Sequence, residues 1–173
     1  MAKYELVKES KIQFQKENGE TVELYRIRAL TSFADVQAGD IGGYIEKESN
    51  LSQEGTSWVY ENAKVYDDAV VCDNAAVDWA NVYGEAEVSG EAVVDQAKVY
   101  GKAKVHGKAR VRERAKVYGE AEVSGEAVVS CAVVFDKAKV YGYARVDVGA
   151  RVHGEAKIYD KATLTWRSGV VSF

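Results

Sequence analysis

One aliphatic residue recurs every five or six positions through most of this chain. Between Val65 and Val170, 15 of the 18 steps are six residues long and three are five. Alanine usually stands two positions before each member, and glycine or aspartate often stands two after, so the unit is Ala-x-Val-x-(Gly/Asp)-x. A helix turns about 100° per residue and would spread this period over all its faces. The alternation inside each short Ala-x-Val segment is that of a strand.

The three five-residue steps indicate how many sides the coil has. They separate Val77 from Val82, Val94 from Val99, and Val129 from Val134. If every third member belongs to one side, all three shortened steps fall at the same corner. The segment 82–94 also recurs unchanged at 117–129, an offset of 35 residues or two rungs. Glycine and aspartate suit corners that need positive φ. We therefore predict an all-β, three-sided parallel β-helix solenoid of about six to seven rungs.

The repeat over residues 63–170 resembles the hexapeptide-repeat left-handed β-helix superfamily. That resemblance implies a left-handed coil and a homotrimer, and the superfamily includes many acyltransferases. The segments 24–27 (Leu-Tyr-Arg-Ile) and 42–48 (Gly-Gly-Tyr-Ile-Glu-Lys-Glu), followed by the solenoid, are also similar to a family of uncharacterised bacterial and phage proteins. The transferase name of that family reflects its β-helix and no known reaction.

The first 50 residues do not repeat. Ile12 and Phe14 alternate with polar residues, Asn18-Gly19 is a typical hairpin turn, and the alternation resumes at Val22. The glycine-rich segment 38–45 matches neither a dinucleotide-binding loop nor a P-loop, so covering the first rung is the favoured role and phosphate binding the alternative. We predict an N-terminal β-hairpin capping module over 1–50 and the β-helix over 51–173.

Composition restricts the partners and the compartment. The net charge of −4 gives no general attraction to a nucleic-acid polymer or a membrane, and no apolar run is long enough for a membrane span. The N-terminus lacks the apolar core of a signal peptide. Only Cys72 and Cys131 are present, without metal-ligand spacing. We expect a reduced, cytoplasmic protein without a bound metal.

Catalysis would depend on two histidines, His106 and His153. The resemblance implies that an acyltransferase would use one of them as base with acetyl-coenzyme A as acyl donor. Both histidines directly follow a repeat aliphatic, on outward positions of regular rungs, and no insertion interrupts the repeat. A general base works best in a walled pocket that excludes water. The sequence therefore favours a protein without catalytic activity or cofactor, and acyl transfer is the alternative.

A column of aromatic residues should line one side of the coil, because equivalent positions stack about 4.8 Å apart. It consists of Tyr66, Tyr83, Tyr100, Tyr118, Phe135 and His153. Exposed aromatics concentrate binding energy at subunit interfaces, and they also form platforms for bases or sugars. Stacked rings can equally just stabilise the coil. An interface or a stabilising ladder is favoured over a ligand platform.

Charges alternate between neighbouring rungs on another side. The expected cross-rung groups are Glu85–Lys102–Glu120, Glu87–Lys104–Glu122 and Glu91–Lys108–Glu126. On the third side Arg110 would lie between two exposed valines, Arg112 between Asp95 and Ser130, and Arg114 at the corner. Arginine binds phosphate and carboxylate groups in a bidentate manner. These three arginines are therefore predicted to form an anion site or, with equal weight, a protein interface.

Together these features favour a non-catalytic homo-oligomer, a trimer by resemblance, that binds a partner on rigid faces. If a phage encodes it, we hypothesise that it interferes with host defence by trapping a nucleotide-like anionic signal or by blocking a defence protein. A hexapeptide-repeat acyltransferase or acetyltransferase is the first alternative. A structural polymer of solenoids stacked end to end is the second.

Overall fold

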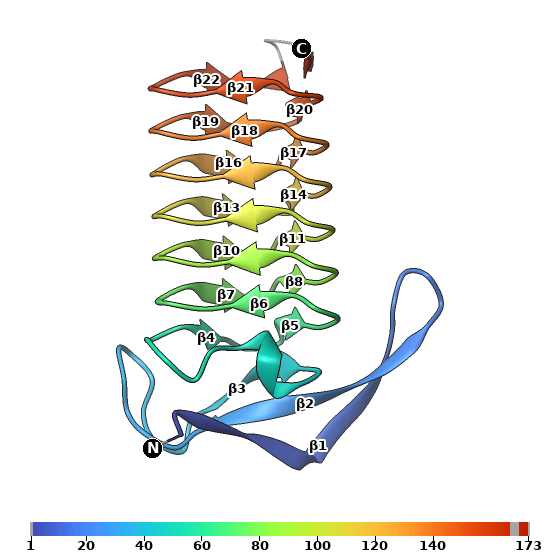
Figure 1. Ribbon diagram of the computed structural model, residues 1–173, viewed down its shortest axis with the longest axis vertical. Helices are drawn as coiled ribbons and strands as arrows, with labels where there is room; N and C mark the ends of the chain where they lie inside the picture. Colours follow the sequence, from blue (N-terminus) through green and yellow to red (C-terminus); the bar gives the residue numbers. More distant parts are fainter. Residues whose placement is uncertain (1, 167–169, 173) are drawn as a thin grey trace.

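The computed structural model describes residues 2–166 and the strand 170–172. The chain forms a parallel β-solenoid of about seven turns with an antiparallel hairpin at its N-terminal end (Figure 1). Each turn runs from right to left across the front of Figure 1 and from left to right behind while the chain rises, which gives a left-handed coil. In the described part of the chain, no helix is long and apolar enough to cross a membrane.

The solenoid has three faces, which we number by the order in which the chain reaches them. Face 1 consists of β5 (Lys64–Val65), β8 (Asn81–Val82), β11 (Lys98–Val99), β14 (Lys116–Val117), β17 (Val133–Val134), β20 (Arg151–His153) and β23 (Val170–Ser172). Face 2 consists of β6 (Val70–Val71), β9 (Glu87–Val88), β12 (Lys104–Val105), β15 (Glu122–Val123), β18 (Lys139–Val140) and β21 (Lys157–Ile158). Face 3 consists of β4 (Trp58–Val59), β7 (Ala76–Asp78), β10 (Val93–Asp95), β13 (Arg110–Arg112), β16 (Val128–Ser130), β19 (Arg145–Val146) and β22 (Thr163–Leu164).

The repeat aliphatics form three vertical columns inside the coil. On face 1, Val99 of β11 pairs in register with Val82 below and Val117 above. These valines, and alanines such as Ala103, have almost no solvent exposure. Because alanine and valine fill the interior alternately, the narrow coil has little space for larger side chains. The prediction of three faces from the shortened steps is confirmed.

Residues with positive φ turn the chain at the corners. Gly101 has a φ of 71°, and a Cβ there would lie 3.0 Å from the backbone nitrogen of Gly119 in the next rung. The shortened corners turn through one positive-φ residue each, such as Gln96 at 50°. The longer corner between β13 and β14 uses two, Glu113 and Arg114. Five-residue and six-residue steps are thus two ways of making the same corner.

The N-terminal segment extends the sheet of face 1. β1 (Tyr4–Gln15) and β2 (Thr21–Ala29) form the hairpin, and β3 (Ile41–Ile45) pairs with β2 on one edge and runs parallel to β5 on the other. A Cβ on Gly42 or Gly43 would lie within 2.7 Å of a backbone oxygen of the first rung. The glycine-rich segment therefore packs as a strand against the solenoid and does not form an open phosphate-binding loop.

The coil begins one rung before the repeat that is visible in the sequence. Ile45 of β3 occupies face 1, Leu51 bridges to Val71 on face 2, and Val59 of β4 occupies face 3. The spacing from Leu51 to Val59 is eight residues, with the 3₁₀ turn η1 (Glu48–Asn50) just before it. This irregular spacing conceals the rung from a search for steps of five or six.

Buried polar contacts fasten the N-terminus to this first rung. The Lys3 ammonium donates hydrogen bonds to Ser57 O at 3.0 Å and Ser57 Oγ at 3.2 Å, and burial lowers the pKa of Lys3 to about 8. The Tyr4 hydroxyl donates to Leu51 O at 2.7 Å. At the hairpin, the Phe14 ring packs 5.4 Å from the Tyr66 ring. The hairpin thus continues the aromatic column of the solenoid downward.

Candidate functional site

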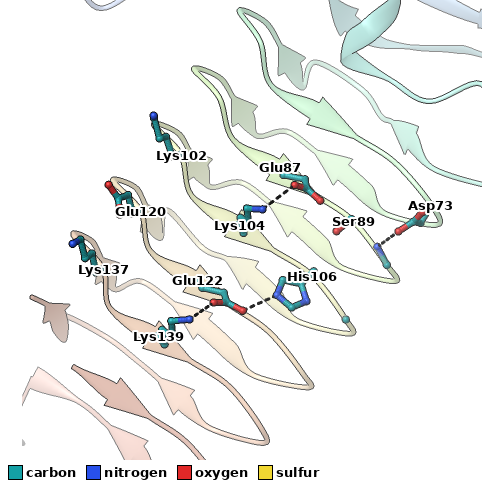
Figure 2. Close-up of a pocket in the computed structure, with 12 residues that line it drawn as sticks. Asp73, Glu87, Ser89, Lys102, Lys104, His106, Glu120, Glu122, Lys137 and Lys139 are labelled. Atoms are coloured by element: carbon teal, nitrogen blue, oxygen red, sulfur yellow. Dashed lines mark hydrogen bonds and ion pairs between the residues drawn. The ribbon is translucent and has the colours of Figure 1, made fainter. Parts of the chain in front are cut away.

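A hollow with a volume of about 910 Å³ lies on face 2. Its floor is the outward column of four successive strands, β9 to β18. These floor residues are Glu87, Lys104, Glu122 and Lys139. Figure 2 shows Lys102, Glu120 and Lys137 along one corner of the hollow, with Ser89 and His106 toward the other. Alternating charge thus places acids and bases next to each other over the whole floor.

The contact between His106 and Glu122 is the part of this hollow that is best suited to acid–base chemistry. His106 Nε2 lies 2.9 Å from Glu122 Oε1, and Lys139 Nζ donates to the other carboxylate oxygen at 2.8 Å (Figure 2). The hydrogen bond from Lys139, and then the one from His106, lower the pKa of Glu122. Glu122 therefore remains an anion at neutral pH and accepts from both neighbours.

This arrangement can orient a general base. With the proton on Nε2 held by Glu122, the unprotonated Nδ1 of His106 is free to accept a proton from a bound substrate. The His106 side chain is 40% exposed and that of Glu122 is 29% exposed. One chain therefore supplies the base and the carboxylate that positions it, while solvent reaches both from the open side of the hollow.

The structure separates the two histidines that the sequence singled out. His153 stacks on Phe135 with ring centroids 5.0 Å apart, at the top of the aromatic column. That column follows face 1, whereas His106 belongs to the hollow on face 2. Of the two, His106 has the carboxylate partner and the adjoining space that acid–base chemistry needs.

The rings of the aromatic column lie almost parallel, one above another. From Tyr66 to Phe135, successive ring centroids are 4.8 to 5.1 Å apart and the ring planes deviate by 2° to 11°. The sequence led us to expect exposed rings, and this is wrong. Tyr66 is 2% exposed, and the rings above it are half-buried because each covers the next. A role of the column as a subunit interface stays a prediction.

The three arginines do not converge on one hollow. Arg110 lies between Val93 and Val128 as predicted, but these valines are half-buried and not fully exposed. Arg112 Nε lies 3.8 Å from Glu113 Oε1, and Arg114 lines a separate small cavity of about 180 Å³ beside Trp79. An anion site formed by all three arginines therefore stays a prediction.

The predicted cross-rung pairs form in one direction only. Lys104 pairs with Glu87 of the rung below at 3.4 Å, and Lys102 and Lys108 pair with Glu85 and Glu91 at 3.7 Å. Glu122 instead pairs upward with Lys139 and diagonally with His106 of the rung below. Sequence reasoning thus missed the His106–Glu122 pair. The signal was present, since His106 precedes Glu122 by 16 residues, close to one rung.

Metal binding has no obvious place in the described residues, which contain no group of three or more His, Cys, Asp or Glu side chains able to hold an ion. Cys72 and Cys131 are both free thiols. Cys72 is partly buried, and this burial raises its pKa, which makes the thiol less reactive. Neither cysteine contributes to the hollow on face 2.

Comparison with known proteins adds a partial relative. No protein-family model matches the chain. A segment of 80 residues is 39% identical to the "Uncharacterized acetyltransferase YdcK" of Escherichia coli K12. The match covers 44% of this chain and 24% of that protein, so the chain corresponds to about a quarter of the length of this relative. The fold is a parallel β-solenoid of about seven turns, and its six-residue repeat is similar to that of hexapeptide-repeat β-helix proteins.

Proposed function

We propose that the protein transfers an acyl group from a thioester, such as acetyl-coenzyme A, to a hydroxyl or amine, with His106 as general base. The observation that carries this proposal is the His106–Glu122 contact of 2.9 Å inside the hollow on face 2. The partial similarity to a protein that is named an acetyltransferase supports the same reaction class.

The proposed reaction assigns one role to each group. Nδ1 of His106 accepts the proton of the acceptor O–H or N–H while the acceptor attacks the thioester carbonyl. When the resulting tetrahedral intermediate collapses, the C–S bond breaks and the imidazolium returns the proton to the thiolate. Glu122 keeps the ring in position and stabilises its cationic form. Lys102 and Lys137, at the rim of the hollow, can bind phosphates of the donor.

Thiol release from acetyl-coenzyme A, with a panel of amine and hydroxyl acceptors, tests the reaction. We expect His106→Gln to lower kcat by roughly 10²-fold or more, and Glu122→Gln to lower it less. His153→Gln is the matched control and should keep the wild-type rate, because this ring lies in the aromatic column. An absence of acceptor-dependent release, or a His106→Gln variant with full activity, would contradict acyl transfer.

The second candidate function is non-catalytic binding by a homo-oligomer. The regular strands from β5 to β22 favour it, because no excursion between these strands encloses the hollow. Under this proposal a nucleotide-like anion or a defence protein of the host binds a face of the solenoid. Calorimetry with cyclic and adenine-containing nucleotides tests the small-molecule form. A variant with Arg110, Arg112 and Arg114 all replaced by alanine should lose the binding, and equal affinity would argue against an arginine site.

Native mass spectrometry of the protein as purified from cells separates the two candidates further. It reports the oligomer mass and any retained small molecule. The homotrimer implied by the resemblance, and the polymer of solenoids stacked end to end, are both tested by the same spectrum. A retained ligand in the absence of thioester turnover would favour the binding protein.

A further inference from the structure

Face 3 differs from the other two faces in its unsatisfied polar groups. Within the described residues, two buried side-chain atoms make no hydrogen bond, and they are Asp78 Oδ1 and Arg112 Nε. Both side chains belong to one outward column of face 3, in which Asp95 lies between them. Arg112 has an ion-pair contact with Glu113 at 3.8 Å, and Asp78 accepts a hydrogen bond from the Trp79 backbone. Buried polar atoms are normally hydrogen-bonded, so the two atoms that still lack a hydrogen bond need an explanation.

Charge along this column is segregated and does not alternate. Asp78 and Asp95 are adjacent, and burial and then the charge of Asp95 raise the pKa of Asp78. Asp35 lies beside them, where it accepts a hydrogen bond of 2.7 Å from Tyr60 and lines a hollow of about 360 Å³ together with both aspartates. The lower part of face 3 is therefore acidic, and the next rung up carries Arg110 and Arg112.

The neighbouring outward column makes face 3 suitable for close approach. Its members Ala76, Val93 and Val128 are short and only partly buried, and the longer, exposed Arg110 lies between the two valines. Sheets packed face to face lie about 10 Å apart, a distance that short side chains permit. A partner for this face should offer similar apolar groups together with the opposite order of charges.

We propose that this partner is a second copy of the chain, bound antiparallel through face 3. A two-fold axis parallel to the strands, between β10 and β13, inverts the order of the rungs but keeps each outward column opposite itself. Asp95 of each protomer then lies opposite Arg112 of its partner, and Asp78 lies opposite Ser130. In the second column, Ala76 lies opposite Val128, and Val93 lies opposite Arg110. The acidic lower part of each face thus meets the basic part of the other.

Arrangements that keep the rungs level lack this complementarity. A two-fold axis parallel to the solenoid axis exchanges the two outward columns, so that Arg112 would lie opposite Arg110 of the partner. Like charges in contact at an interface cost free energy and select against such a mode. A three-fold axis along the solenoid also keeps the rungs level and does not bring Asp95 opposite Arg112. The inference is independent of the proposed acyl transfer, because the hollow lies on face 2.

Charge reversal tests the pairing in the full chain by sedimentation over a range of protein concentrations. We expect a two-chain species for the wild type. Asp95→Arg alone and Arg112→Asp alone should each raise the dissociation constant by roughly thirtyfold or more. The double variant carries the reversed pair on both protomers and should regain most of the affinity. Circular dichroism checks that each variant is folded.

The matched control is Glu87→Arg, which reverses the charge of an outward acid on face 2 and should leave the mass of the assembly unchanged. A wild type that is monomeric at every concentration, or a trimer of any affinity, overturns the inference. So does a dimer that tolerates both single charge reversals, or a double variant that stays as weak as the single ones.

Discussion

The outward side chains of faces 1 and 2 contact complementary side chains in neighbouring rungs, whereas the lower rungs of face 3 repeat the same charge. On face 1, rings such as Tyr83 and Tyr100 stack at 4.9 Å, and on face 2 Lys104 and Glu87 pair across rungs. On face 3, Asp78 and Asp95 repeat the same charge in adjacent rungs. The interior under all three faces has the same alanine and valine columns. In such a coil the interior determines the fold, and the outward columns distinguish one face from another.

If this comparison holds, the same core substitution under two different faces should lower the free energy of unfolding by the same amount. Val105→Ala under face 2 and Val111→Ala under face 3 each remove two buried methyl groups. Each should lower the free energy of unfolding by about 2–3 kcal/mol, through lost burial and a residual cavity. Urea denaturation of the two variants measures the difference. Values that differ by more than about 1 kcal/mol would mean that the interior is not equivalent under the two faces.

The aromatic column of face 1 should be the next most sensitive feature. Tyr100→Ala removes ring contacts with Tyr83 and Tyr118 at 4.9 and 4.8 Å. We expect a loss of about 1–3 kcal/mol of unfolding free energy. Tyr100→Phe keeps the rings stacked and should be nearly neutral in the same denaturation experiment. If both variants cost the same, the hydroxyl and not the stacking would be responsible.

A substitution on face 3, at Asp78, should instead stabilise the protein. The raised pKa of Asp78 means that the folded state binds this proton more tightly than the unfolded state, so the carboxylate destabilises the protein once the pH exceeds its unfolded pKa. Asp78→Asn should therefore raise the unfolding free energy at neutral pH by about 1 kcal/mol or less. The gain should vanish as the pH falls below the unfolded pKa. Thermal unfolding of dilute protein across this pH range provides the measurement, and a loss of stability at pH 7 would contradict the expectation.

Removal of a single charge on face 2 should have the smallest effect on the free energy of unfolding. Lys104 pairs with Glu87 at 3.4 Å, but the side chains are 62% and 43% exposed. Lys104→Ala should cost about 0.5 kcal/mol or less, and salt should reduce that cost further. Thermal unfolding at low and high ionic strength checks both points. A cost above 1 kcal/mol that persists in salt would show that face 2 depends on its ion pairs as strongly as face 1 depends on its rings.

The sequence predicted the columns well, because strand alternation and a fixed rung length determine which residues lie above one another. Tyr83, Tyr100 and Tyr118 could be aligned in this way without coordinates. The contact between His106 and Glu122 could not, since a long side chain can reach one rung up, one rung down or sideways. The rung formed by Ile45, Leu51 and Val59 does not appear in the count of the repeat, because its eight-residue step interrupts the period. Regular backbone was predictable from the sequence, but the choice among competing side-chain partners was not.

The identical segments 82–94 and 117–129 have a consequence for how such a chain can change its length in evolution. Deleting 35 residues between equivalent points would remove two rungs and leave an identical junction with the same order of charges. Deleting only the rung 99–116 would bring Glu87 next to Glu122 and Glu85 next to Glu120. Duplication or loss of paired rungs therefore keeps the alternation of charge and could give longer or shorter relatives without further change. Single-rung changes there would need compensating substitutions.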